Sequence, residues 1–155
     1  MEIRVARPED IPGLTDLLLQ VGEVHHKIRP DLFRSGAQKY DEKALTEILK
    51  DPNRPIFAAV EDGRLLGYCF CVLEITRDNP VLMDQKSLYI DDLCVDENAR
   101  GKHVGARLYD FAVDYARKIG CDSLTLNVWC GNDSAMKFYE SRGLKQRNIH
   151  MEARL

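Results

Sequence analysis

The chain has 155 residues, of which 45% are hydrophobic and 30% are charged, and its 22 basic and 25 acidic residues give a formal charge of −3. This length fits one domain of ordinary size, and the apolar content is too high for a disordered chain. The slightly negative net charge argues against nonspecific electrostatic binding to nucleic acid or to an anionic membrane. The chain has no run of about 20 apolar residues and no apolar stretch at its charged N-terminus. We therefore expect one cytoplasmic domain over residues 1–155.

The number and spacing of the cysteines also indicate a reducing compartment. There are five, and Cys69 and Cys71 lie in an apolar run where cysteine behaves as a small buried hydrophobe. The sequence has no CxxC pair and no Cys/His cluster with zinc spacing. We expect all five to be reduced and structural, and we expect no metal site.

The first half of the chain reads as a strand followed by helices. Proline and two acidic residues after the strand are typical of a first helical turn, and Asp41 is suited to cap a later helix. The predicted elements are a strand over Glu2–Ala6, a helix from Pro8 carrying Ile11, Leu14, Leu18 and Val21, a short helix around Val24–Ile28, and a helix after Asp41 carrying Leu45, Ile48 and Leu49.

The second half begins with strands. Asp62-Gly63 between two β-rich runs predicts a two-residue hairpin turn, and Gly120 and Gly143 each mark the end of a helix. The predicted elements are strands over Pro55–Glu61, Arg64–Ile75 and Ser87–Val95, a helix over Val104–Ile119, a strand over Ser123–Trp129, a helix over Asp133–Arg142 and a last strand over His150–Leu155. The order β-α-α-β-β-β-α-β-α-β predicts an α/β domain with a mixed, mostly antiparallel sheet flanked by helices.

Residues 100–106 form a basic, glycine-containing junction between a strand and a helix. Unbonded N–H groups and the helix dipole favour an anion at such a helix N-terminus, and Arg100 and Lys102 add positive charge. The glycines Gly101 and Gly105 let a ligand approach the main chain. The pattern indicates a phosphate site, the alternative being an ordinary surface loop. It is not a P-loop, because GxxxxGK[ST] is absent.

A second informative stretch covers residues 126–144. Asn132 and Tyr139 are seven positions apart and nearly eclipsed on one helix face, whereas Phe138 points away from them and suits the core. Tyr139 is then free to face a cleft beside the preceding strand. The alternative is a half-buried tyrosine whose hydroxyl simply meets water.

Together the two stretches resemble the GNAT superfamily of acyl-CoA-dependent N-acetyltransferases. The superfamily's acetyl-CoA loop, Q/R-x-x-G-x-G/A, is matched by Arg100-Gly101-Lys102-His103-Val104-Gly105 except at His103, where a glycine is usual. Its second motif, N-x-x-A-x-x-F-Y-x-x-x-G-F/L, is matched at Asn132, Ala135, Phe138, Tyr139, Gly143 and Leu144. The predicted element order agrees over the whole chain, so the resemblance implies the GNAT fold and acetyl-CoA as co-substrate.

The resemblance also implies residue roles. The strand before the loop would separate from the next strand and bind the pantetheine arm through the main chain of Leu93, Cys94 and Val95. Asn132 resembles the side chain that contacts the pantetheine region, and Tyr139 resembles the acid that protonates the departing thiolate. The pyrophosphate would lie against Arg100, Gly101, Lys102, His103, Val104, Gly105 and Ala106. If the position of His103 needs a positive φ, histidine tolerates it better than most side chains.

The sequence offers two candidates for the general base. Some relatives carry a glutamate on the strand before the asparagine motif, but Asn127 stands there and cannot act as a base. Asp91 and Asp92 remain, and consecutive strand residues face opposite sides unless a bulge intervenes. We favour Asp91, because a relative with a polyamine acceptor carries glutamate there. The alternative is a solvated carboxylate at a strand end.

The acceptor is expected between the first helices and the last strand, near His25, His26, Arg29 and Asp31. A small amine, an aminoglycoside, a protein N-terminus and a lysine side chain all stay open. We expect a small-molecule or peptide amine as partner, no nucleic acid and no membrane, and a homodimer stays open. The rival hypothesis is a non-catalytic acyl-CoA-binding sensor. A covalent route through Cys94 or Cys130 is a weaker third alternative.

Overall fold

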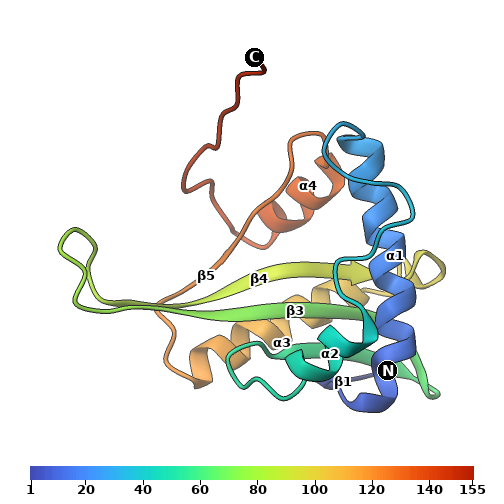
Figure 1. Cartoon of the computed structure of the whole chain (residues 1–155). Helices are drawn as coiled ribbons and strands as arrows, with labels where there is room; N and C mark the ends of the chain where they lie inside the picture. The colour runs from blue at the N-terminus through green and yellow to red at the C-terminus, as the bar shows by residue number, and fades with distance from the viewer.

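The computed structural model describes residues 1–155 as one sheet with helices on both faces (Figure 1). The strands are β1 (Glu2–Val5), β2 (Ile56–Glu61), β3 (Arg64–Thr76), β4 (Gln85–Val95) and β5 (Ser123–Leu126). The α-helices are α1 (Ile11–Ile28), α2 (Glu42–Ile48), α3 (Val104–Lys118) and α4 (Asp133–Ser141), and 3₁₀ turns cover Pro8–Asp10 and Glu97–Ala99.

The sheet has the order β1-β2-β3-β4-β5, and every neighbouring pair is antiparallel except β4 and β5. The parallel pair is joined by α3, because two parallel strands need a crossover connection. The predicted α/β class and the mixed, mostly antiparallel sheet are confirmed. The predicted hairpin is also present, with Asp62 and Gly63 at φ values of 51° and 76°, as the turn between twisted strands requires.

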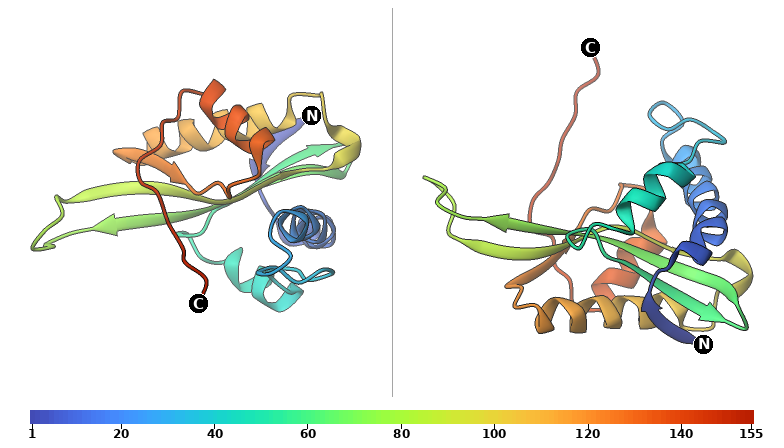
Figure 2. Two further views of the ribbon diagram at one scale, coloured as in Figure 1. Left: turned by 90° about the horizontal axis from the view of Figure 1, so that it is seen from above. Right: turned by 60° about the horizontal axis from the view of Figure 1, so that its bottom comes forward.

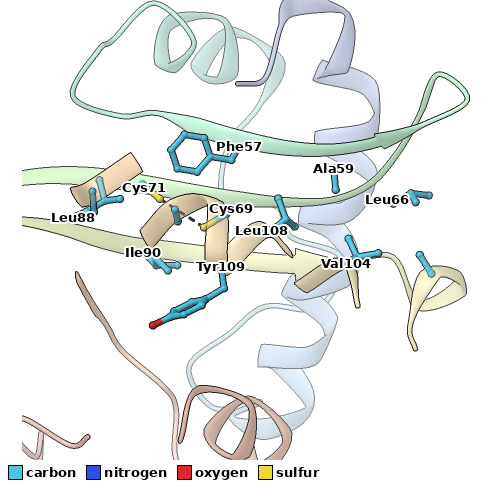
Figure 3. Close-up of a cluster of buried hydrophobic side chains, with 13 residues drawn as sticks. Phe57, Ala59, Leu66, Cys69, Cys71, Leu88, Ile90, Val104, Leu108 and Tyr109 are labelled. Atoms are coloured by element: carbon cyan, nitrogen blue, oxygen red, sulfur yellow. Dashed lines mark hydrogen bonds between the residues drawn. The ribbon is translucent and has the colours of Figure 1, made fainter. Parts of the chain in front are cut away.

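Side chains along the central strands point alternately to the two faces of the sheet, so the core has two layers. Phe57 and Cys69 face α3, whereas Ala58 and Tyr68 face α1 and α2. Figure 2 shows α1 and α2 on one face of the sheet and α3 and α4 on the other. Figure 3 shows the α3-side layer, in which the Sγ atoms of Cys69 and Cys71 are 3.6 Å apart. All five cysteines are free thiols.

Several predicted boundaries were wrong. Residues 24–28 are not a separate helix but the last turns of α1, because Val21 and Val24 continue its helical spacing without a break. Pro8–Asp10 forms a 3₁₀ turn before α1, and the strand predicted over 123–129 ends at Leu126. None of the helices combines the length and apolar character that crossing a membrane requires.

The last predicted strand, His150–Leu155, does not form. No main-chain hydrogen bond reaches any residue after Leu144, and in Figure 1 residues 145–155, here called the tail, run away from the sheet. Alternating apolar and polar residues make a strand only when a neighbour supplies the hydrogen-bonding partners. The tail has the pattern of a strand and lacks that neighbour within its own chain.

Candidate active site

Strands β4 and β5 separate halfway along β4. Their pairing ends at Ile90 and Leu126, whereas the pairing of β4 with β3 continues to Val95. The main chain of Leu93, Cys94 and Val95 therefore has no strand on its β5 side. Such groups can bond an extended ligand as they would bond another strand. The separation expected from the sequence is present.

The phosphate loop, residues 100–106, leads directly from β4 into α3. The first turn of α3 has neither side-chain capping nor main-chain partners for its N–H groups. The unbonded N–H groups of the loop belong to Gly101, His103, Val104, Gly105 and Ala106. Together with the dipole of the 15-residue helix, these donors make a site for an anion.

Gly105 keeps space open beside this loop. A Cβ at this position would lie 3.4 Å from Val95 Cγ2 and 3.8 Å from the Phe138 ring, so a side chain longer than methyl would enter the space between β4 and α4. Arg100 is exposed and in no ion pair, whereas Lys102 lies 3.7 Å from Glu61. The donors and the open space fit a pyrophosphate followed by an extended arm.

His103 occupies the left-handed region at the N-cap of α3. Its φ and ψ are 58° and 22°, so this position does require the positive φ that a glycine adopts freely. Histidine is among the side chains that tolerate the region better than most. The loop therefore keeps its geometry despite the departure from the family motif.

Asn132 and Tyr139 are positioned by α4. The Asn132 side-chain oxygen caps the helix by accepting from the N–H of Ala135, at 3.3 Å, and its amide nitrogen makes no hydrogen bond within the protein. The ring of Tyr139 packs against Phe138, with ring centroids 5.1 Å apart. Phe138 packs against the α3-side core, as the sequence predicted, although it is only partly buried. Asn132 thus has a structural role that the sequence analysis missed, although asparagine is a common N-cap.

Tyr139 carries a firmly held proton. The side chain is half-buried, and its hydroxyl makes no hydrogen bond within the protein. Burial raises the pKa of Tyr139 well above the ordinary value, and the nearby Cys69 and Asp92 act in the same direction. The hydroxyl is therefore protonated at neutral pH, and its lack of a partner leaves the proton available, although the raised pKa makes it a weaker acid than a free tyrosine.

The two carboxylates of β4 lie at a β-bulge. Along β3, Phe70 is opposite Asp92 and the next residue, Cys71, is opposite Ile90, so Asp91 is the extra residue. A bulge resets the alternation of a strand. Both carboxylates consequently face the α1–α2 side of the sheet rather than opposite sides.

Asp91 and Asp92 have different partners on that side. Asp91 accepts hydrogen bonds from Lys39 Nζ at 2.7 Å and from Tyr40 Oη at 2.9 Å. Asp92 accepts one from Tyr68 Oη, at 2.8 Å. Burial raises the pKa of Asp92, and this effect outweighs the hydrogen bond from Tyr68 that lowers it. Asp91 is held in an ion pair with Lys39, whereas the pKa of the buried Asp92 is raised from its ordinary value, the direction that favours a general base.

The segment after α1 forms one wall near the end of the strands. His25 lies against Phe33, with ring centroids 5.1 Å apart, and His26 Nδ1 donates to the Phe33 carbonyl at 2.7 Å. Phe33 in turn meets Trp129, which follows β5, edge to face at 5.1 Å. Both histidines therefore support an aromatic contact that joins the α1 side to the loop after β5.

The remaining candidates also have structural partners. Arg29 and Asp31 pair with each other at 2.7 Å. Asn127 donates to Tyr89 Oη at 3.1 Å. Burial raises the pKa of the Cys94 thiol to about 12, which argues against a nucleophilic role at neutral pH. Sequence analysis missed the side chains that donate to the two carboxylates, which are Lys39, Tyr40 and Tyr68. Only the bulge brings both Asp91 and Asp92 to the α1–α2 side of the sheet, where these residues lie.

The separated strands β4 and β5 and the open N-terminus of α3 are the features that the resemblance to the GNAT superfamily implied for an acyl-CoA-binding transferase. The acetyltransferase (GNAT) family profile matches residues 22–144. A Bacillus subtilis relative, described as the uncharacterized N-acetyltransferase YhfO, is 31% identical over 149 residues, which cover 94% of this chain and 91% of the relative. The chain therefore belongs to the GNAT acetyltransferase family.

Solved structures share the fold. A variant of the BH1408 protein from Bacillus halodurans superposes with a TM-score of 0.95 at 30% identity, covering 100% of this chain and 99% of the other. The aminoglycoside N-acetyltransferase AAC(6')-Iy in complex with CoA superposes with a TM-score of 0.71 at 17% identity, covering 99% of this chain and 100% of the other. At that identity the second match shows the shared fold alone.

Proposed function

We propose that the protein transfers an acetyl group from acetyl-CoA to a primary amine of an acceptor, by direct attack in a ternary complex. The observation that carries this proposal is the unpaired end of β4 beside the open first turn of α3. Family membership and the CoA complex of one fold relative support the same co-substrate. Five free cysteines fit action in the cytoplasm, a reducing compartment.

Two parts of the chain would hold acetyl-CoA, which supplies the acetyl thioester. The main chain of Leu93, Cys94 and Val95 would bond the pantetheine arm, with the free amide of Asn132 on the other side of the gap. The phosphate loop would bond the pyrophosphate through its unbonded N–H groups, with Arg100 near it in the chain. Gly105 would leave room for the arm where it passes from the loop into the gap.

Tyr139 and a β4 carboxylate would move the protons. An amine of pKa near 10.4 reaches the protein protonated, so a base must take its proton before the nitrogen attacks. Asp91 was the sequence-based candidate, but its ion pair with Lys39 and the raised pKa of Asp92 favour Asp92, directly or through water. As the C–N bond forms and the C–S bond breaks, Tyr139 would donate its proton to the departing thiolate sulfur.

Calorimetric titration of acetyl-CoA tests the binding half of this proposal. Gly105→Glu places a carboxylate in the space beside the phosphate loop, whereas Thr46→Glu adds the same charge at an exposed position on α2. We expect the Gly105 variant to lose measurable affinity and the Thr46 variant to bind as the wild type does. Equal affinity for all three proteins would remove the phosphate loop from the account.

A further inference from the structure

The joining segment, residues 29–41 between α1 and α2, is fixed on α1. Figure 1 shows it running back along that helix toward α2. At Gly22 a Cβ would lie 2.5 Å from the carbonyl oxygen of Ala37, so the glycine allows the main chain of the segment to touch the helix. The Glu23 carboxylate accepts a hydrogen bond from the N–H of Gly36, at 2.5 Å. These contacts fix the joining segment just before it reaches β4.

Lys39, near the end of the joining segment, places its ammonium group on the carboxylates of β4. Lys39 Nζ lies 2.7 Å from Asp91 Oδ1 and 5.5 Å from the centre of the Tyr40 ring. Burial lowers the pKa of Lys39, but the hydrogen bond to Asp91 and the charges of both carboxylates outweigh it and raise the pKa. A carboxylate and an aromatic face are the groups that bind an alkylammonium ion in proteins. Lys39 therefore occupies a site suited to a primary ammonium ion.

This ammonium group lies where the parts of the proposed reaction meet. Asp91 and Asp92 directly follow Ile90, the residue at which the pairing of β4 with β5 ends. The ammonium of Lys39 is therefore at the start of the gap that would hold the thioester. Burial is the main cause of the raised pKa of Tyr139, and the charge of Asp92 contributes to it. The lysine and the proposed acid are thus both within electrostatic range of the candidate base.

We propose that Lys39 is a self-acetylation site, at which the protein transfers an acetyl group to Lys39 Nζ from the acetyl-CoA bound to the same chain. The proposal rests on the proposed function and adds an internal acceptor to it. Lys39 Nζ gives one proton to Asp92, directly or through water, and then attacks the thioester carbonyl carbon. The C–N bond forms, the C–S bond breaks, and Tyr139 protonates the thiolate. The second proton lost from Nζ restores Tyr139 through water, and Asp92 releases its proton to solvent.

Acetylation at this position changes the charge of the site, and a nearby lysine provides the control. An acetylated Lys39 is neutral, so Asp91 loses its cationic partner and is left to pair with a cationic acceptor. Lys43 is four residues further along the chain and exposed in the first turn of α2. Uncatalysed acetylation should reach Lys43 at least as readily as Lys39, because the ion pair keeps Lys39 protonated. Faster acetylation of Lys39 therefore indicates catalysis.

Incubation with deuterated acetyl-CoA and no added amine tests the proposal, with peptide mass spectrometry as the readout. We expect deuterated acetyl groups to appear on Lys39 more than about tenfold faster than on Lys43. The rate at Lys39 should saturate with acetyl-CoA and should not depend on protein concentration, since donor and acceptor share one chain. Gly105→Glu should lower the rate at Lys39 by more than about tenfold, whereas Thr46→Glu should keep it. Unlabelled acetyl groups on freshly purified wild type that are absent from the Gly105 variant count as the same reaction.

Three results would each overturn the proposal. They are equal rates at Lys39 and Lys43, a rate at Lys39 that rises with protein concentration, and a rate at Lys39 that Gly105→Glu leaves unchanged. Small primary amines added to the same assay separate this proposal from the proposed function. If an added amine is acetylated and Lys39 is not, self-acetylation is wrong and the proposed function stands. If neither is acetylated, both are wrong.

Discussion

Removal of the Tyr139 hydroxyl separates a role in turnover from a role in folding. Tyr139→Phe keeps the ring, which packs against Phe138 and Tyr109 with centroids 5.1 and 6.3 Å apart. Since the hydroxyl has no hydrogen-bond partner in the protein, its loss should change the free energy of unfolding by less than about 0.5 kcal/mol. If it protonates the leaving thiolate, kcat should fall by about 10²–10⁴-fold, equivalent to about 3–5 kcal/mol of transition-state stabilisation.

The assay is continuous thiol release from acetyl-CoA at saturating acceptor, together with calorimetric binding of acetyl-CoA and thermal unfolding. Tyr109→Phe is the matched control, since Tyr109 is a neighbouring tyrosine that also makes no hydrogen bond through its hydroxyl. The control should keep wild-type kcat, and both variants should keep wild-type affinity for acetyl-CoA. A Tyr139 variant that turns over within about threefold of the wild type would refute the acid assignment.

Two further predictions concern buried carboxylates. Asp92→Asn should lower kcat by about 10²-fold. It should also remove the acidic limb of the pH profile of kcat/KM, which we expect above about pH 3.9 because burial raises the pKa of Asp92. The control variant Asp91→Asn should keep that limb. Arg4→Leu leaves the buried Asp10 without the two hydrogen bonds of 2.7 and 3.0 Å that it accepts from Arg4. Urea unfolding at pH 7 should show that the free energy of unfolding falls by about 3 kcal/mol. Burial disfavours the charged form of Asp10, but the hydrogen bonds from Arg4 and the main chain outweigh this effect and lower the pKa of Asp10. The difference in free energy of unfolding between the wild type and the variant should therefore be complete above pH 3.8. It should vanish as the pH falls through the lowered pKa.

Features that depend on neighbouring residues were predictable from the sequence. The Asp62-Gly63 turn follows from two residues that both accept a positive φ. The Asp41 side chain caps α2 by accepting from the N–H of Ala44 at 2.7 Å, as its position suggested. The phosphate loop and the α4 motif were found because their residues are close together in the chain.

Features that depend on distant residues were not predictable. The bulge at Asp91 follows from the register of β4 against β3, and only the folded chain brings Lys39 and Tyr40 to that carboxylate. The same limit explains the wrong strand over 150–155, whose alternation is real but which has no strand beside it in the fold. Local pattern therefore predicted the candidate site, whereas strand pairing determines which partners each of the two β4 carboxylates has.

Amine-dependent release of CoA tests the central claim most directly. Thiol release from acetyl-CoA would be followed with a panel of small amines, polyamines, aminoglycosides and peptides with free N-termini or lysines, and mass spectrometry would identify the acetylated product. The account predicts that at least one primary amine raises the rate more than about tenfold above hydrolysis and is recovered N-acetylated. Tight acetyl-CoA binding with no amine-dependent release anywhere in the panel would contradict it and favour a non-catalytic acyl-CoA sensor.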